Sequence, residues 1–402
     1  MNRNLALLLC FFFSHAIFHF LSHSFAVLLP SIRETFQVSA IQIGALITVR
    51  ELGSGLISLP GGMISDYFSD RRGLFLSVCL LMFALGWLVV GSAPLFLALH
   101  AGILLIAAAG TLWHLPSLVE LGGRFPHRRG TVFAVHGAGG SLGDIVGPIA
   151  TGFLLAFLSW REILSCYAIP PLVMALLTFL LFRRLSEETP QSKGDLLRSS
   201  RYAPKEHIRL SLELFKTTDI WLINVVAGLR AMCFTVIITF LPMVMHDSGF
   251  SAQSIGFHFG LLWVVGLLAS PVMGYLSDRC SRKVVLVPAL LYSSLLVSVI
   301  GLYGTGPMFT VLIILLGFSI RSDYSLINAA IIDIVKGKAE NTMLGILTFS
   351  RSMMGAVAPL MAGFLYQYYG MRPTFVFVGV LFLAAGILFS RVRLLPRMQE
   401  TP

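Results

Sequence analysis

Long apolar runs alternate with short polar segments along the whole chain. A helix needs about 20 apolar residues to cross a ~30 Å hydrocarbon layer, and twelve runs reach this length. The runs are continuous and do not alternate with polar positions, which indicates helices rather than barrel strands. The predicted spans are residues 5–29, 41–64, 74–92, 95–119, 131–157, 163–182, 218–244, 252–276, 284–304, 308–333, 342–367 and 373–390. We expect Pro30, Pro94, Pro307 and Pro373 to mark span ends.

The composition supports this pattern. The residues are 56% hydrophobic and 12% charged, about half the charge of a soluble domain. No small-residue cleavage site follows the first apolar run, so no cleavable signal is predicted. The five cysteines have no CxxC or metal-ligand spacing. We therefore predict an all-α integral membrane protein with reduced cysteines.

The positions of Lys and Arg predict the orientation. If the N-terminus is cytoplasmic, 22 of the 29 basic residues lie in cytoplasmic segments, 3 in outer loops and 4 inside spans. Cytoplasmic loops of membrane proteins carry such an excess. This places both termini in the cytoplasm. The basic residues of the cytoplasmic loops also account for the net charge of +10, so no nucleic-acid partner is expected.

Two polar hinges indicate an internal repeat. The first runs from Gly61 through Asp66 to Arg72, and the second from Gly274 through Asp278 to Lys283. Gly62 and Gly274 are 212 residues apart, and residues 130–152 match 341–363 at an offset of 211. We predict six-helix bundles at 1–182 and 217–402, joined by a cytoplasmic loop at 183–216. Parallel repeats of six spans are typical of secondary transporters.

The hinges resemble the signature between spans two and three of the major facilitator superfamily. The second copy is closer to it, with Asp278-Arg279 adjacent, whereas the first has Tyr67 after Asp66 and a late basic pair. Further motifs resemble the fosmidomycin-resistance branch, although His19 stands where that branch has an acid. Those motifs are Ser14-His15, Trp113-His114-Leu115-Pro116, Arg129-Gly130 and Gly139-Gly140-Ser-Leu-Gly143 with Gly147-Pro148.

This resemblance implies two pseudo-symmetric six-helix bundles in a monomeric drug/proton antiporter of the bacterial inner membrane. We expect gating by the hinges and by the glycine–proline pair of span five. Asp66 is expected to cap the helix that begins near Asn341, and the Asp278 hinge to form the more regular latch. The predicted gating residues are Gly62, Asp66, Arg71, Arg72, Gly147, Pro148, Gly274, Asp278, Arg279 and Arg282.

Charged residues inside the spans are candidates for the transport site, because a lone charge at this depth is costly. A rise of 1.5 Å per residue places most of them near the midplane. The alternative is that they form buried ion pairs that only hold helices together. Arg230 and Arg351 have no acid nearby in sequence, so we expect them to contact substrate or to pair with Asp144 and Glu51. The set is Arg50, Glu51, Asp144, Arg230, Arg321, Asp323 and Arg351.

Histidines form a second candidate group. His15, His19 and His23 recur every fourth residue and share one face of span one. Imidazole titrates near neutral pH, which suits a proton relay; core histidines bonded to carbonyls and a metal site are the alternatives. No local carboxylate or cysteine completes the set, so no metal site is predicted. His114 and His136 are also candidates for the cavity.

Function is predicted from what these groups can do together. The sequence has no Walker motif and no plausible catalytic triad, so we expect neither an enzyme nor a cofactor, and an ion gradient as the energy source. Four midplane arginines face three acids, which favours an anionic or zwitterionic solute. We predict proton-coupled export of a small molecule, with membrane lipid as the surroundings. The alternatives are proton-coupled import of an organic anion, or a sensor that has lost transport.

Overall fold

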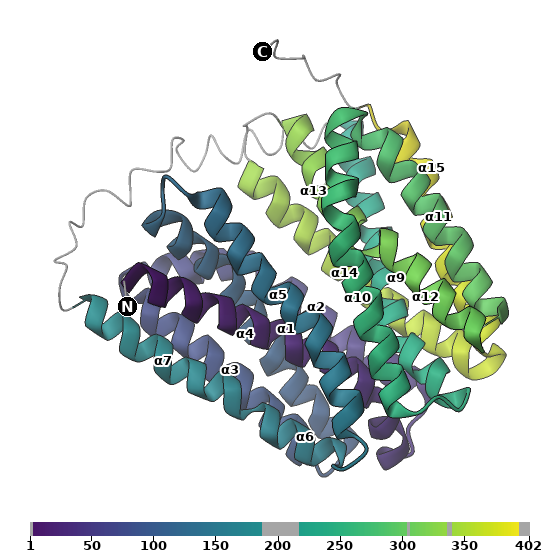
Figure 1. Ribbon diagram of the computed structural model, residues 1–402, viewed down its shortest axis with the longest axis horizontal. Coiled ribbons are helices and arrows are strands. Elements are labelled where there is room, and N and C mark those ends of the chain that lie inside the picture. Colours follow the sequence, from purple (N-terminus) through teal and green to yellow (C-terminus); the bar gives the residue numbers. More distant parts are fainter. Residues whose placement is uncertain (1–2, 187–216, 304–305, 336–339, 394–402) are drawn as a thin grey trace.

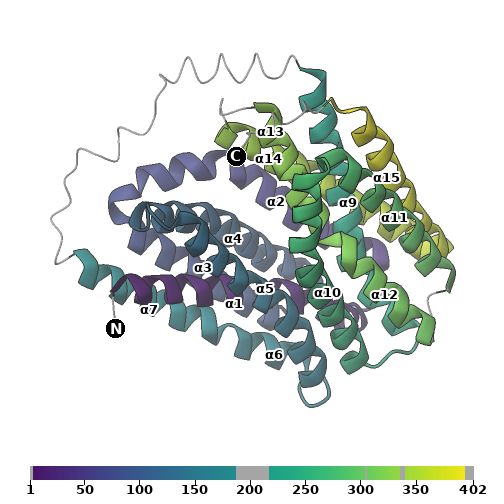
Figure 2. The same ribbon diagram turned by 45° about the horizontal axis from the view of Figure 1, so that its top comes forward.

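The chain folds into helices that collect on two sides. The computed structural model describes residues 3–186, 217–303, 306–335 and 340–393, and these are helical apart from turns and connections. Helices α1–α7 lie on one side and α9–α15 on the other (Figures 1 and 2). The first group is α1 (Arg3–Phe36), α2 (Ala40–Tyr67), the short η1 (Ser69–Arg71), α3 (Arg72–Ser92), α4 (Phe96–Arg124), α5 (Arg129–Leu154), α6 (Trp160–Tyr167) and α7 (Ile169–Ser186).

The second group is α9 (Thr218–Asp247), α10 (Ala252–Arg279), α11 (Arg282–Tyr303), α12 (Pro307–Ile320), α13 (Ser322–Val335), α14 (Glu340–Tyr369) and α15 (Met371–Arg391). The all-α membrane fold is therefore confirmed. From residue 187 onward, the predicted loop 183–216 lies outside the described residues.

Two predicted spans are broken rather than continuous. The sixth divides into α6 and α7 just before Pro170 and Pro171, since a proline supplies no N–H to the preceding turn. The tenth divides into α12 and α13 at Arg321, without a proline or glycine at the break. The prediction that Pro30 ends span one was wrong, because α1 continues to Phe36 with Pro30 inside it. Membrane helices tolerate such a proline where neighbouring groups satisfy the freed carbonyl.

Helix α5 differs from the others in hydropathy. Among the described residues, eleven helical stretches are long and apolar enough to cross a membrane, and α5 is not one of them. Its glycines and Asp144 lower its hydropathy. The helix packs between α1 and α10, so its polar face is covered by protein rather than by lipid.

Glycines bring the two sides into contact at four related positions. A Cβ on Gly44 of α2 would overlap the Pro359 carbonyl oxygen of α14, and one on Gly256 of α10 would overlap that of Pro148. In the same way, Gly363 abuts the Ala40 carbonyl and Gly152 that of Ala252. Each pair maps onto its counterpart at an offset of 211 or 212 residues. The contact is thus built twice, by the two copies of the repeat.

Five helical turns further along, the same faces are open. Gly62 lies 18 residues after Gly44, and Gly274 lies 18 after Gly256, so each pair shares a helix face. Nothing approaches within 4 Å of a Cβ placed on either Gly62 or Gly274. The halves of the protein therefore meet at the end that holds Phe36 and Asp247, here called the far end. They are apart at the hinge end, which holds η1 and the α10–α11 turn.

Candidate functional site

Asp144 of α5 is the centre of a polar cluster in the middle of the molecule. The residue is buried, with 2% of its surface exposed. Oδ1 lies 2.6 Å from His19 Nδ1 and 3.1 Å from His23 Nε2. Oδ2 accepts from Arg321 Nη1 at 2.7 Å, and Arg321 Nη2 also donates to the Ser141 hydroxyl at 2.6 Å. Because Arg321 lies at the α12–α13 break, this ion pair joins the two sides of the protein.

The glycine stripe of α5 positions the histidines of α1. A Cβ on Gly139, Gly143 or Gly147 would overlap the carbonyl oxygens of Phe12, Ala16 and Phe20 respectively. Small residues at every fourth position allow two membrane helices to approach this closely. The close approach carries His19 and His23, one turn apart on α1, to the carboxylate of Asp144.

Three more histidines lie beside this cluster. His15 Nδ1 is 2.8 Å from the His136 carbonyl oxygen, and the two rings stack with centroids 4.1 Å apart. His114 of α4 has its Nδ1 2.7 Å from the Gly110 carbonyl oxygen. The ring centroid of His15 lies 4.5 Å from that of His19 and 5.2 Å from that of His114. The fold thus gathers all five predicted histidines of the first half, although α4 and α5 supply two of them.

A second polar cluster belongs entirely to the second half. Arg230 Nε donates to Asp323 Oδ1 at 2.7 Å, and its Nη2 donates to the Ile320 carbonyl at the helix break. The Arg351 guanidinium lies 4.2 Å from the centre of the Tyr324 ring. The predicted pairing of Arg230 or Arg351 with Asp144 was wrong. Arg321 is closer in space because the break in span ten turns it toward α5.

Arg50 and Glu51 form no ion pair with each other. Neighbouring residues on a helix point about 100° apart, and among the described residues no ion pair within 4.0 Å includes either side chain. Glu51 therefore has no ion-pair partner within 4.0 Å in the described part of the chain, although the charge of the neighbouring Arg50 acts on its carboxyl group.

The hinge residues form a matched pair of ionic contacts. Arg72 bonds Glu120 of α4 at 3.1 Å in the first half, and Arg282 bonds Asp333 of α13 at 3.0 Å in the second. Arg282 also bonds Asp278 at 2.6 Å. Arg279 lies over the Tyr275 ring at 4.8 Å, and Arg71 is exposed. The expected cap between Asp66 and Asn341 lies outside the described side chains.

The far end carries an ionic contact that sequence reasoning missed. Arg33 of α1 donates to Asp247 of α9 at 2.8 Å, and the Tyr366 hydroxyl of α14 donates to the same carboxylate at 2.6 Å. The sequence signal was Arg33, one of only three basic residues in the predicted outer loops. This contact closes the far end between the two sides.

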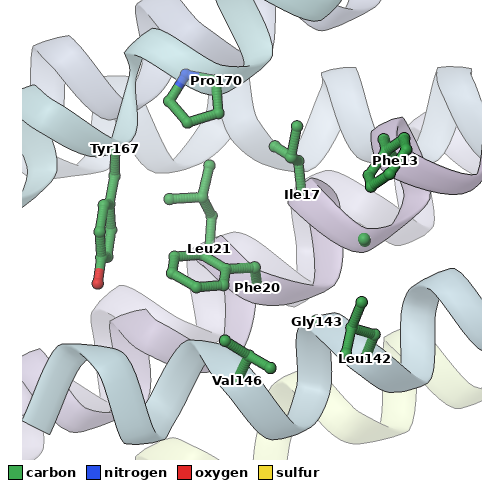
Figure 3. Close-up of a pocket in the computed structure, with 10 residues that line it drawn as sticks. Phe13, Ile17, Phe20, Leu21, Leu142, Gly143, Val146, Tyr167 and Pro170 are labelled. Atoms are coloured by element: carbon green, nitrogen blue, oxygen red, sulfur yellow. The ribbon is translucent and has the colours of Figure 1, made fainter. Parts of the chain in front are cut away.

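An apolar cavity of about 220 Å³ lies on another face of α1 (Figure 3). Phe13, Ile17 and Phe20 line it from α1, and Leu142 and Val146 from α5. No charged side chain lines it. The cavity is therefore separate from the polar cluster around Asp144.

Comparison with known proteins agrees with this architecture. Two curated relatives are bacterial transport proteins. The "Hexuronate transporter" of Bacillus subtilis (strain 168) is 23% identical over 395 residues, covering 94% of this chain and 90% of the relative. The "Multidrug resistance protein MdtG" of Salmonella typhi is 28% identical over 346 residues, covering 81% of this chain and 80% of the relative.

Solved structures share the fold at low identity. A bacterial homologue of the human lysosomal transporter Spinster superposes with a TM-score of 0.80 at 15% identity, covering 97% of both chains. The nucleoside transporter NupG gives a TM-score of 0.76 at 15% identity, covering 97% of this chain and 98% of its own. The family model of the Major Facilitator Superfamily matches residues 11–267 and 223–402. The chain is therefore a member of the Major Facilitator Superfamily of membrane transporters.

Proposed function

We propose that this transporter moves a small organic carboxylate by proton-coupled alternating access, with export as the working direction. Arg351 carries the proposal. It is 8% exposed, and its Nε and Nη2 have no hydrogen-bond partner among the described residues. These two N–H groups form one edge of the guanidinium, which matches the two oxygens of a carboxylate. Unsatisfied buried donors cost about 1–3 kcal/mol each, so an entering anion would relieve that cost.

The surroundings of Arg351 suit an organic anion. Arg230 lies near the same ring, with its guanidinium 5.7 Å from the centre of Tyr324, but Asp323 already neutralises it. Arg351 therefore supplies the uncompensated charge, and the Tyr324 ring supplies a flat apolar surface beside it. The relative named as a hexuronate transporter makes a hexuronate the first probe.

The Asp144–Arg321 ion pair supports alternating access. It lies between the two sides of the protein, while the far end is sealed and the hinge end is apart. We propose bundles at 1–182 and 217–402 that rock about this centre, in a monomer surrounded by lipid. We also propose that the protein lies in a bacterial inner membrane with both termini in the cytoplasm, so that the described conformation faces inward.

Arg351→Lys tests the substrate class. Lysine keeps the charge but lacks the paired donors, so we expect uptake of labelled hexuronate into inside-out vesicles to fall at least ~10-fold. Arg128→Lys, at an exposed position of the α4–α5 loop, is the control and should transport normally. Normal transport by Arg351→Lys would show that Arg351 does not bind the substrate. Failure of the wild type to bind or transport a series of mono- and dicarboxylates would reject the substrate class.

Glu51→Gln tests the proton coupling. A midplane carboxyl group that is not held in a direct ion pair is a natural proton carrier, so its amide should abolish gradient-driven uptake while exchange of labelled for unlabelled solute continues. A protonophore should collapse wild-type uptake in inside-out vesicles if export is correct. Collapse only in right-side-out vesicles would instead support the second candidate, import of an organic anion by symport. A variant that still concentrates solute would exclude Glu51 as the carrier.

A further inference from the structure

The histidines of α1 and α4 have a feature that transport of a carboxylate does not require. His15, His19 and His114 each offer a ring nitrogen, and these three atoms lie within 4.8 Å of one another. The prediction of no metal site considered span one alone. Packing of α4 against α1 supplies His114, which completes a set of three.

The hydrogen bonds of the three rings select the nitrogen that remains available. Each Nδ1 lies close to an oxygen acceptor: His15 to the His136 carbonyl at 2.8 Å, His19 to Asp144 at 2.6 Å, and His114 to the Gly110 carbonyl at 2.7 Å. These acceptors hold the proton of a neutral imidazole on Nδ1, so the free lone pair is on Nε2. Metal-binding histidines are commonly oriented in this way by a carbonyl or carboxylate.

The surroundings match a metal centre with an open position. All three side chains are partly exposed rather than sealed, so they remain accessible to an ion. The indole of Trp113 stacks on the His15 ring at 6.2 Å, and Phe18 lies 5.3 Å from His114. Apolar aromatic rings therefore flank two of the three imidazoles. Three histidines with a free fourth position are a ligand set that Zn²⁺ takes in proteins.

A neighbouring set is a weaker candidate. His19, His23 and Asp144 also place three ligand atoms within 4.8 Å. However, both oxygens of Asp144 are already occupied, and the cationic Arg321 lies 2.7 Å from one of them. A divalent ion there would face a positive charge at close range, whereas in the first set Asp144 acts through His19.

We propose that His15, His19 and His114 bind one divalent transition-metal ion of the Zn²⁺ class, with Asp144, Gly110 and the His136 carbonyl orienting the ligands. The site is in the first half of the chain and is distinct from the Arg351 position. Its existence does not depend on the solute or on the direction of transport.

Metal titration of the purified full-length chain in detergent tests the proposal. Co²⁺ reports a site of this kind by its visible absorption, and Zn²⁺ should displace it. We expect one equivalent of Co²⁺ and at least ~100-fold weaker binding in each of His15→Ala, His19→Ala and His114→Ala. His127→Ala, at an exposed loop position, and His23→Ala should bind as the wild type does.

Two further measurements keep the result interpretable. His114→Gln retains an amide that can donate to the Gly110 carbonyl, so it should fold and still fail to bind. X-ray absorption of the Zn²⁺-loaded wild type should show three imidazole nitrogens at about 2.0–2.1 Å. Absence of stoichiometric binding would overturn the proposal. So would loss of binding in His23→Ala with retention in His114→Ala, which would assign the ion to the other set.

Discussion

At the scale of single residues, the choice of ionic partners is the main result. Asp144 has Arg321 from the second half as its guanidinium partner, while Arg230 pairs with Asp323 inside that half. The break between α12 and α13 explains this difference, since it places Arg321 against α5 and frees the Ile320 carbonyl for Arg230. Buried charges of this kind are costly to leave unpaired.

Arg321→Gln tests the contribution of the pair that joins the two sides. The variant leaves Asp144 with only its two histidines, so we expect a loss of about 1–3 kcal/mol and a lower unfolding temperature in detergent. Adding Asp144→Asn removes the unpaired charge, so the double variant should recover part of the loss. Losses that simply add in a thermal double-mutant cycle would show that the two groups are not coupled.

At the scale of helices, glycine contacts decide which ends touch. Helix α2 meets α14, and α5 meets α10, through backbone contacts at Gly44, Gly256, Gly152 and Gly363. The same helix faces are open at Gly62 and Gly274. A side chain at the first positions must therefore separate two backbones, whereas one at the second positions occupies free space.

Gly44→Ala and Gly62→Ala form a matched pair on α2. The methyl group at residue 44 would overlap the Pro359 carbonyl, and overpacking of this kind costs about 1–3 kcal/mol. We expect a lower unfolding temperature and a longer far-end distance between spin labels on α2 and α14. Gly62→Ala should change neither. Similar behaviour of the two variants would contradict the assignment of the sealed end.

At the scale of the whole molecule, the described conformation is closed at one end. Arg33, Asp247 and Tyr366 tie α1, α9 and α14 together at the far end. At the hinge end, the ionic contacts of Arg72 and Arg282 stay within their own halves. With the predicted orientation, this conformation faces inward. The positions of the cysteines provide a test of that orientation.

Cys280 reports the orientation. It is exposed in the turn between α10 and α11 at the hinge end. In a variant whose other four cysteines are alanine, a membrane-impermeant maleimide should label inverted vesicles and leave intact spheroplasts unlabelled. Ser248→Cys in a cysteine-free chain, at the far end after α9, should show the opposite pattern. Labelling of Cys280 in intact spheroplasts would reverse the proposed topology.

Much of the fold was predictable from the sequence, and less of the site. Hydropathy placed the twelve runs because lipid imposes a minimum length on each helix. The repeat offset identifies Pro148 and Pro359 as equivalent positions from the sequence alone. The histidine stripe was also visible, since α-helical periodicity aligns residues four apart. The sequence did not predict the break at Arg321, because no proline marks it. It also did not predict the contact between Arg33, Asp247 and Tyr366.

The membrane character, the helical class, the repeat and the types of residue available at the midplane therefore follow from the order of amino acids alone. These properties follow from local hydropathy and periodicity, which do not depend on neighbouring helices. The packing of the helices sets which charges pair, which end is sealed and that His114 joins His15 and His19. Those relations depend on distances between helices that are far apart in sequence, and backbone contact at a few glycines sets these distances.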